Sequence, residues 1–239
     1  MRHLFLLAAL FCACISYAQI RVQERLPKSK TGFALTTAKT RAKIYYDVND
    51  ALVIKRSAEL FARDIQMVTG QKPELIQKRE RAKALVIVGT IEKNQWICEL
   101  AQKGKIDIRP LQGAWERYLI QTVDNPSPGV AKALVIAGSD RRGAAYGLFS
   151  ISEMMGVSPW YWWGDVPVKT HKALYVDAPP TYSKTPSVKY RGIFLNDEDW
   201  GLKPWAAKTF EKERGNIGPR TYAKICELLL RLKANHLAP

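Results

Sequence analysis

The sequence is poor in the residues that bind metals and form disulfides. It has only four cysteines and three histidines in 239 residues, and two of the cysteines lie in an apolar amino-terminal segment. The other two, Cys98 and Cys226, fall in separate predicted helices, and we expect them to be core residues, with a disulfide between them left open. Because His171 and His236 are isolated as well, the sequence predicts no metal site.

Long apolar runs are confined to the amino terminus. The run from Leu4 to Ile15 follows Arg2 and precedes a small-residue cleavage motif, which is the layout of a signal peptide. It is shorter than the roughly 20 residues that span a bilayer. An anchor at Cys12 or Cys14 is the alternative, which a neighbouring phenylalanine disfavours. We therefore predict a signal peptide over residues 1–18, export to the periplasm or the extracellular space, and no membrane span.

Acidic residues are also scarce, with 22 Asp and Glu against 37 Lys and Arg and a net charge of +15. Such a charge is typical of nucleic-acid-binding proteins. However, the basic residues are spread along the chain in ones and twos, Glu80 interrupts the densest run at 77–83, and no zinc-finger spacing or RNA-binding signature is present. We predict no nucleic-acid partner and a basic surface that attracts acidic polysaccharide.

The clearest predicted helix covers residues 51–69. Its apolar residues recur at steps of three and four, which indicates one buried face. Asp50 is the expected N-cap, and Gly70 is the expected stop. The buried stripe consists of Ile54, Ala58, Phe61, Ile65 and Val68.

Two nearly identical runs, Lys83–Thr90 and Lys132–Ser139, predict strands that are buried on both faces. Such strands require helices on both sides of a sheet. The other expected elements are helices at 92–103 and 141–155, strands at 44–48 and 117–123, and a turn-rich connector at 124–129. The sequence therefore predicts an α/β domain over residues 19–177, in which helices cover a mixed sheet.

A glycine-containing segment at 138–147 joins the second of these strands to a helix. This position can bind phosphate, but the glycine spacing does not match a dinucleotide or phosphate loop. We favour a packing role, in which Gly143 and Gly147 allow the helix to approach the sheet. The expected buried stripe of this helix is Ala144, Leu148, Ile151 and Met155.

The chain after this domain has the pattern of a second one. Prolines make residues 178–187 a predicted linker. A strand is expected at 188–195, a helix at 219–233 and another strand edge at 235–238. This order is typical of the first βα unit of a (β/α)8 barrel, which takes about 250 residues. We therefore interpret residues 188–239 as the start of an incomplete barrel.

Tryptophans are concentrated in the second half of the chain. Trp160, Trp162 and Trp163 fall within four residues. Aromatic faces can stack on sugar rings, and they also bury about 150–250 Å² each. The cluster is thus either an aromatic platform for sugar or a packing contact between domains.

Polar residues end the predicted strand at 188–195. Asn196, Asp197 and Glu198 follow it directly, at the strand end that faces the active site in βα barrels. They suit the recognition of sugar hydroxyls, and capping or ion pairing within a loop is the alternative. Arg191, at the other end of the strand, is expected either to form a buried ion pair or to bind a substrate carboxylate.

Several of these segments together resemble glycoside hydrolase family 115. The resemblance covers about residues 40–239, in order and at natural spacing. The matching segments are residues 138–148 (GSDRRGAAYGL), 156–168 (GVSPWYWWGDVPV), 191–201 (RGIFLNDEDWG), 202–210 (LKPWAAKTF), 217–219 (IGP) and 228–235 (LLLRLKAN). His236 and Leu237 differ from the family pattern, in which more apolar or aromatic residues are expected at these positions.

The resemblance implies an α/β amino-terminal domain, a (β/α)8 catalytic barrel and further domains, often in a homodimer. It implies hydrolysis, with inversion, of the α-1,2 bond between glucuronic acid or its 4-O-methyl form and xylan, with no cofactor. Glucuronoxylan and its oligosaccharides are then the partners. Asn196, Asp197, Glu198 and Trp200 match the first-strand motif and are expected to bind substrate. The general acid and base are expected beyond Pro239, so this chain alone is expected to be inactive.

Two alternatives remain at this point. The chain is either a complete, secreted carbohydrate-binding module whose tryptophans form an exposed platform, or part of an N-acetylhexosaminidase-like glycosidase with the same domain plan. Quenching of tryptophan fluorescence by xylo-oligosaccharides separates the first alternative from the family interpretation. Activity confined to N-acetylhexosamine glycosides separates the second.

Overall fold

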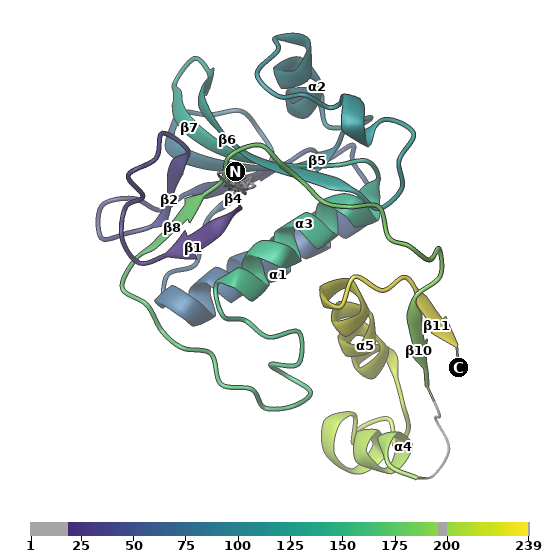
Figure 1. Ribbon diagram of the computed structural model, residues 1–239. Coiled ribbons are helices and arrows are strands. Elements are labelled where there is room, and N and C mark those ends of the chain that lie inside the picture. The colour runs from purple at the N-terminus through teal and green to yellow at the C-terminus, as the bar shows by residue number, and fades with distance from the viewer. Residues whose placement is uncertain (1–18, 196–199, 239) are drawn as a thin grey trace, which may run out of the picture.

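A six-stranded mixed sheet forms the centre of the amino-terminal part of the chain (Figure 1). The computed structural model describes residues 19–195 and 200–238. In spatial order the strands are β4 (Leu75–Ile76), β3 (Lys43–Tyr46), β5 (Ala82–Thr90), β7 (Val130–Gly138), β6 (Tyr118–Ser127) and β9 (Thr181–Tyr182). The first four are parallel, whereas β6 runs antiparallel to both β7 and β9. The predicted α/β class with a mixed sheet is therefore confirmed.

The two near-identical runs form neighbouring parallel strands, β5 and β7, in the middle of this sheet. Both are buried along most of their length, as predicted. The predicted connector at 124–129 is wrong in its first part, because β6 continues to Ser127 with Asp124 opposite Lys132. Only Pro128 and Gly129 remain for the turn, and Gly129 has the positive φ of 84° that such a tight turn requires.

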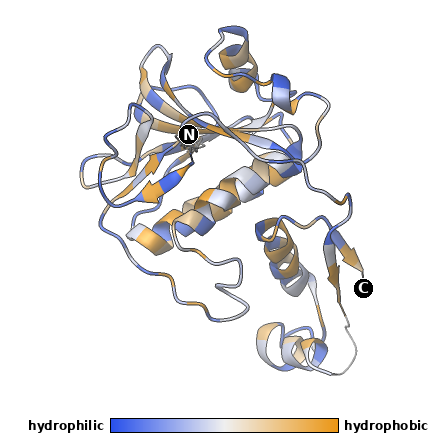
Figure 2. Cartoon of the chain, viewed as in Figure 1, coloured by the Kyte–Doolittle hydropathy of each residue, from blue (hydrophilic) through white to orange (hydrophobic). Residues whose placement is uncertain are grey.

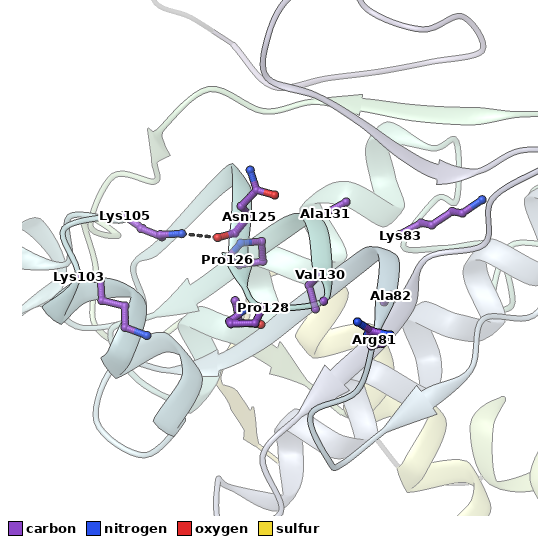
Figure 3. Close-up of a pocket in the computed structure, with 12 residues that line it drawn as sticks. Arg81, Ala82, Lys83, Lys103, Lys105, Asn125, Pro126, Pro128, Val130 and Ala131 are labelled. Carbon is purple, nitrogen blue, oxygen red and sulfur yellow. Dashed lines mark hydrogen bonds between the residues drawn. The ribbon is translucent and has the colours of Figure 1, made fainter.

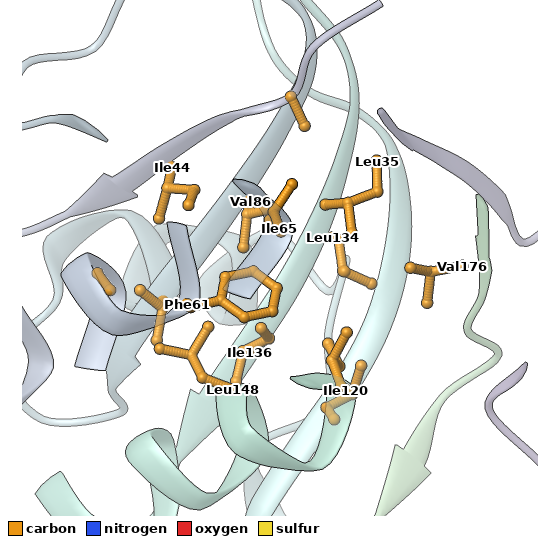
Figure 4. Packing of buried hydrophobic residues seen from close by; sticks show 14 of the residues in the cluster. Leu35, Ile44, Phe61, Ile65, Val86, Ile120, Leu134, Ile136, Leu148 and Val176 are labelled. Atoms are coloured by element: carbon orange, nitrogen blue, oxygen red, sulfur yellow. The ribbon is translucent and has the colours of Figure 1, made fainter. Parts of the chain in front are cut away.

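Helices cover both faces of the sheet. Helices α1 (Leu52–Thr69) and α3 (Arg141–Met154) pack on one face, and α2 (Gln95–Gln102) packs on the other (Figure 1). Figure 2 shows hydrophobic and hydrophilic patches along α1 and α3, as expected for amphipathic helices. Figure 4 shows Phe61 and Ile65 of α1 meeting Val86 and Ile136 of the sheet. Both predicted buried stripes are confirmed.

The helix ends differ in part from the predictions. Gly70 ends α1 with a φ of 71°, as predicted. Asp50 as the N-cap is wrong, because the cap position is Ala51 and no side chain caps the helix. Instead, one Asp50 carboxylate oxygen accepts a 2.7 Å hydrogen bond from the Thr90 backbone N–H and ties the start of α1 to the end of β5. Helix α2 begins later than predicted, because the Asn94 side chain caps it.

A second, three-stranded sheet was not predicted. It consists of β1 (Arg21–Gln23), β8 (Leu174–Asp177) and β2 (Gly32–Thr36), with β8 in the middle and both neighbours antiparallel to it. Its apolar residues, among them Phe33 and Val176, join the core on the α1 and α3 side of the main sheet. A short 3-10 helix, η1 (Arg109–Leu111), precedes β6.

The carboxy-terminal part is a small β-α-β unit. Strands β10 (Gly192–Phe194) and β11 (His236–Ala238) pair in parallel, and between them lie α4 (Leu202–Trp205), the π-helical segment η2 (Ala206–Phe210) and α5 (Pro219–Arg231). The predicted helix and second strand are confirmed, and the first strand is shorter than predicted. The predicted linker at 178–187 contains β9, which pairs with β6 at the edge of the main sheet. The domain boundaries themselves stay a prediction.

Cys98 and Cys226 both lie in helices and are free. Cys98 is half-buried, but Cys226 is exposed, so its assignment to the core is wrong. Cys226 lines an open hollow between α1 and α5, together with residues such as Arg56 and Leu230. Over residues 19–195 and 200–238, no helix is long and apolar enough to cross a membrane, and no group of three metal-binding side chains occurs.

Candidate functional site

A buried ion-pair network joins α5 to the main domain. Arg231 donates two hydrogen bonds of 2.8 Å to the two carboxylate oxygens of Asp64 on α1. Its Nε also donates to Glu227 Oε1 at 3.0 Å, and the Tyr161 hydroxyl donates to the same oxygen at 2.9 Å. Lys224 lies 3.0 Å from the other oxygen of Glu227. The position of α5 on α1 is thus determined by directional charged contacts.

The surroundings shift the pKa values of this network in different directions. Burial raises the pKa of Asp64 more than the hydrogen bonds and charge of Arg231 lower it. Burial lowers the pKa of Arg231, but the hydrogen bonds and charges of Asp64 and Glu227 outweigh it and raise that pKa above its usual value. Burial raises the pKa of Glu227, but Arg231 and Lys224 reverse this effect and lower it overall. Burial and the neighbouring Glu227 raise the pKa of Tyr161 to about 12, so its hydroxyl stays a donor at neutral pH.

A second buried carboxylate, Glu116, lies between the main domain and the β10–β11 pair. It precedes β6 with a φ of 55°, and its side chain is fully buried. Arg142 of α3 donates to Glu116 at 2.6 Å, Asn235 donates at 2.7 Å, and Arg191 donates to its other oxygen. The predicted alternative of a buried ion pair for Arg191 is therefore present, although its partner is a loop residue before β6 and not a neighbouring strand.

The start of α5 is organised by a third buried carboxylate. Glu211 Oε2 accepts hydrogen bonds from the backbone N–H groups of Gly218 at 3.0 Å and Thr221 at 2.8 Å. Burial raises the pKa of Glu211, but these bonds and the Thr221 hydroxyl lower it overall. A carboxylate at the first turn also interacts favourably with the helix dipole.

The predicted tryptophan cluster meets the β-α-β unit at an aromatic hollow. The ring of Trp162 contacts those of Trp163, Trp205 and Phe210 at centroid distances of 4.8, 5.9 and 5.1 Å. Trp163 donates from Nε1 to the Lys224 carbonyl oxygen at 3.3 Å. An open hollow of about 640 Å³ lies here, lined by Tyr161, Trp162, Trp163, Asp165, Gly201, Leu202 and Trp205.

This hollow combines aromatic rings with one exposed carboxylate. Aromatic walls offer faces to the C–H groups of a pyranose ring, and the exposed carboxylate of Asp165 offers an acceptor for hydroxyl groups. Asp165 has a φ of 49°, which is uncommon for a residue other than glycine and occurs often at functional loops. Gly201, which directly precedes α4, also lines the hollow.

Of the other residues that were predicted to form the site, those that the structure describes do not line this hollow. Asn196, Asp197 and Glu198 lie outside the described residues. Trp200 is 88% exposed, and Trp160 is 46% exposed and does not line the hollow. Trp162 and Trp163 pack between the two parts of the chain, and their role in sugar binding stays a prediction.

The sequence interpretation missed Asp165, Trp205 and the buried charges. A signal for Asp64 was present, because it lies three residues after Phe61 and four before Val68, on the apolar face of α1. A charged residue at such a position needs a buried partner. Nothing local identifies that partner, because Asp64 and Arg231 are 167 residues apart.

These features define an α/β protein with a helix-covered mixed sheet, a β-α-β unit attached to it by buried ion pairs, and an aromatic hollow where the two meet. A family model described as glycosyl hydrolase family 115 matches residues 183–239. The structure is similar to that of BtGH115A, a family GH115 4-O-methyl-alpha-glucuronidase with specificity for decorated arabinogalactans. The TM-score is 0.71 and the identity 37%, over 86% of this chain and 25% of that one. The chain belongs to glycosyl hydrolase family 115.

This chain therefore spans about a quarter of the length of BtGH115A. The structures of CpGH84D (TM-score 0.47, 11% identity, 92% of this chain and 35% of that one) and of the GH20 beta-N-acetylhexosaminidase from Streptomyces coelicolor A3(2) (0.43, 13%, 92% and 32%) also match. At such scores these two likenesses support no conclusion about the chain. A search of curated proteins found no match.

Proposed function

We propose that this chain is the amino-terminal part of an exported glycoside hydrolase that removes glucuronic acid or 4-O-methyl-glucuronic acid from a plant polysaccharide. The observation that carries the proposal is the 37% identity to a 4-O-methyl-alpha-glucuronidase over 86% of the chain. The family model over residues 183–239 supports it independently of the amino-terminal domain.

The reaction that we propose is hydrolysis with inversion. The oxygen of a water molecule bonds to the anomeric carbon of the glucuronic acid while the glycosidic bond breaks. One carboxylic acid protonates the leaving sugar oxygen, and a second carboxylate takes the proton of the water. Such carboxyl groups lie roughly 6.5–9.5 Å apart. Adjacent residues such as Asp197 and Glu198 are therefore not assigned as this pair. Their match to the family motif is the reason that we assign them, with Asn196 and Trp200, to substrate binding.

We propose further that the β-α-β unit is the first part of a (β/α)8 barrel. Strands β10 and β11 are parallel with α5 between them in sequence, as in every unit of such a barrel. The segment at 196–199 follows β10, so it would lie at the carboxyl ends of the barrel strands. The chain alone would then be inactive, because the other strands contribute most of the pocket.

Xylan is the polysaccharide that the resemblance favours, and the relative provides a second candidate. BtGH115A has specificity for decorated arabinogalactans, so arabinogalactan with glucuronic acid side chains is the alternative substrate. Both candidates offer the same terminal uronic acid and differ in the sugar that leaves. We also propose that residues 1–18 are a signal peptide that directs export. Export agrees with these substrates, because polysaccharides of this size lie outside the cytoplasm.

The test is release of glucuronic acid from glucuronoxylan and from arabinogalactan, measured for this 239-residue chain and for the product of the intact gene. We expect release by the latter alone and from at least one polysaccharide. Release by the 239-residue chain would contradict the proposed inactivity. A full-length product that acts only on N-acetylhexosamine glycosides would contradict the proposed function.

A further inference from the structure

A second hollow lies on the amino-terminal domain, where β5 and β7 begin and β6 ends. Helix α3 starts at the opposite end of these strands. Its volume is about 740 Å³, and the turn between β6 and β7 forms its floor (Figure 3). The lining residues are Arg81, Ala82, Lys83, Lys103, Lys105, Asn125, Pro126, Ser127, Pro128, Gly129, Val130 and Ala131. None of them lines the aromatic hollow.

All the charged side chains that line this hollow are positive. Figure 3 shows Lys103 and Lys105 on one side of the turn and Arg81 and Lys83 on the other. No carboxylate lines the hollow. Within the described part of the chain, Arg81 and Lys83 form no ion pair, so their charges are available to a ligand.

The acidic groups nearby are already paired. Glu99, which lies 4.0 Å from Lys103, forms a two-fold hydrogen-bonded pair with Arg79 at 2.6 and 2.7 Å. Asp124 pairs with Lys132 at 3.0 Å. The local field in the hollow is therefore positive, in a protein whose net charge is +15.

The floor of the hollow is held in place. The Gly129 carbonyl oxygen accepts a 3.0 Å hydrogen bond from the Ala82 N–H, which ties the turn to the start of β5. The Lys105 ammonium donates to the Asn125 carbonyl oxygen and ties the other side of the turn to the segment after α2. A preformed floor reduces the conformational entropy that the protein loses when a ligand binds.

We propose that this hollow is a non-catalytic binding site for a uronic-acid-bearing stretch of polysaccharide. The ligand class rests on the proposed function, since that function brings the protein to carboxylated glycans. Cations on both sides of an open floor suit carboxylates repeated along a chain. Single-stranded nucleic acid is disfavoured, because its binding sites combine positive charge with aromatic stacking faces, and no aromatic side chain lines the hollow.

The test compares binding of polygalacturonate, neutral arabinoxylan and single-stranded oligothymidylate to the chain by isothermal titration at low ionic strength, about 0.01 M. The variant is Arg81→Gln/Lys83→Gln/Lys103→Gln, which keeps the Lys105 contact to the floor. The control is Lys28→Gln/Lys39→Gln/Lys212→Gln, which removes the same charge from exposed side chains elsewhere. Polygalacturonate is chosen because it carries carboxylates and is not a proposed substrate.

We expect polygalacturonate to bind, arabinoxylan not to bind, and the hollow variant to bind polygalacturonate about tenfold more weakly, while the control changes by less than about twofold. Equal weakening in both variants would show a general field effect and overturn the site, as would tighter binding of oligothymidylate. A hollow-specific loss supports the site even if the gene product releases no glucuronic acid, so failure of the proposed function is distinguishable from failure of this inference.

Discussion

Arg231 and Asp64 form a buried, bidentate ion pair, with two nitrogen–oxygen distances of 2.8 Å. The pair joins the last turn of α5 to the middle of α1, and both side chains are almost completely excluded from solvent. Arg231 also lies over the rings of Phe149 and Tyr161 at 4.8 and 4.9 Å. The carboxy-terminal unit therefore has a defined orientation on the main domain, and the aromatic hollow between them depends on it.

The first prediction is that Asp64→Asn strongly destabilises the chain. The substitution leaves the Arg231 guanidinium buried with one carboxylate fewer, and breaking a buried pair costs about 3–5 kcal/mol. Chemical denaturation followed by circular dichroism measures the free energy of unfolding. Glu59→Gln is the matched control, since Glu59 pairs with Lys55 and Arg56 on the exposed side of the same helix and should change this energy by less than about 1 kcal/mol. Similar losses in the two variants would contradict the structural role of the pair.

The second prediction concerns attachment of the β10–β11 pair. Glu116→Gln removes the charge that binds Arg191 and Arg142, and lost hydrogen bonds to a buried charged group cost about 1.5–3 kcal/mol. Because these contacts join the two parts of the chain, limited proteolysis should cleave faster within residues 183–190 while the main domain stays intact. Glu213→Gln, which removes an exposed pair with Arg220, should leave the cleavage rate unchanged. Faster cleavage only inside the main domain would show that Glu116 stabilises a different region.

The third prediction follows from the lowered pKa values of Glu116, Glu211 and Glu227. Each folded pKa lies below the unfolded value of 4.5, so the unfolded chain binds protons first as the pH falls. The contribution of these groups is complete above that value and is lost as the pH falls through the folded values. Denaturation midpoints should therefore decrease from pH 6 to about pH 3, and the decrease should be smaller in Glu116→Gln. An equal decrease in the variant would exclude Glu116 as a source.

The parts of the fold that local pattern determines were predicted from the sequence. The stripe that includes Phe61 and Ile65 predicted α1, and the repeated aliphatic runs predicted β5 and β7 as strands buried on both faces. The glycine at position 70 also predicted the end of α1. In each case a period or a backbone preference within a few residues carries the information.

The parts that depend on long-range contacts were not predicted. The sheet of β1, β8 and β2 pairs residues that lie between 138 (Thr36 and Leu174) and 156 (Arg21 and Asp177) positions apart in the sequence. Strand β9 lies in a segment whose prolines indicated only a linker. Asp50 was misassigned because its side chain bonds to Thr90 on another strand and not to its own helix. For the aromatic hollow, Trp162 and Trp163 were identified as candidates, whereas Asp165 and Trp205 became candidates only through their positions in space.

The fourth prediction is that Trp205→Leu opens the aromatic hollow. Trp205 stacks on Phe210 at 5.3 Å and contacts both Trp162 and Trp163, so its loss exposes three aromatic rings to water. Tryptophan emission should move to longer wavelength, and stability should fall by about 2–4 kcal/mol. Trp160→Leu removes an exposed tryptophan from the same neighbourhood and serves as the control, with little change in stability. An unchanged emission maximum in Trp205→Leu would contradict the packing described for this hollow.

The fifth prediction is that alanine substitution destabilises the chain at Gly143 but not at Gly201. A Cβ at Gly143 in α3 would overlap the backbone carbonyl oxygen of Arg117, whereas a Cβ at Gly201 meets no atom within 4 Å. Helix propensity alone would make Gly143→Ala stabilising by about 1 kcal/mol. The overlap involves backbone, which cannot rotate away, so we expect a net loss of about 1–3 kcal/mol, as in overpacked cores. Gly201→Ala should change the free energy of unfolding by less than about 0.5 kcal/mol. Denaturation of the two variants measures the difference, and a stabilised Gly143→Ala variant would show that α3 does not need this close approach to β6.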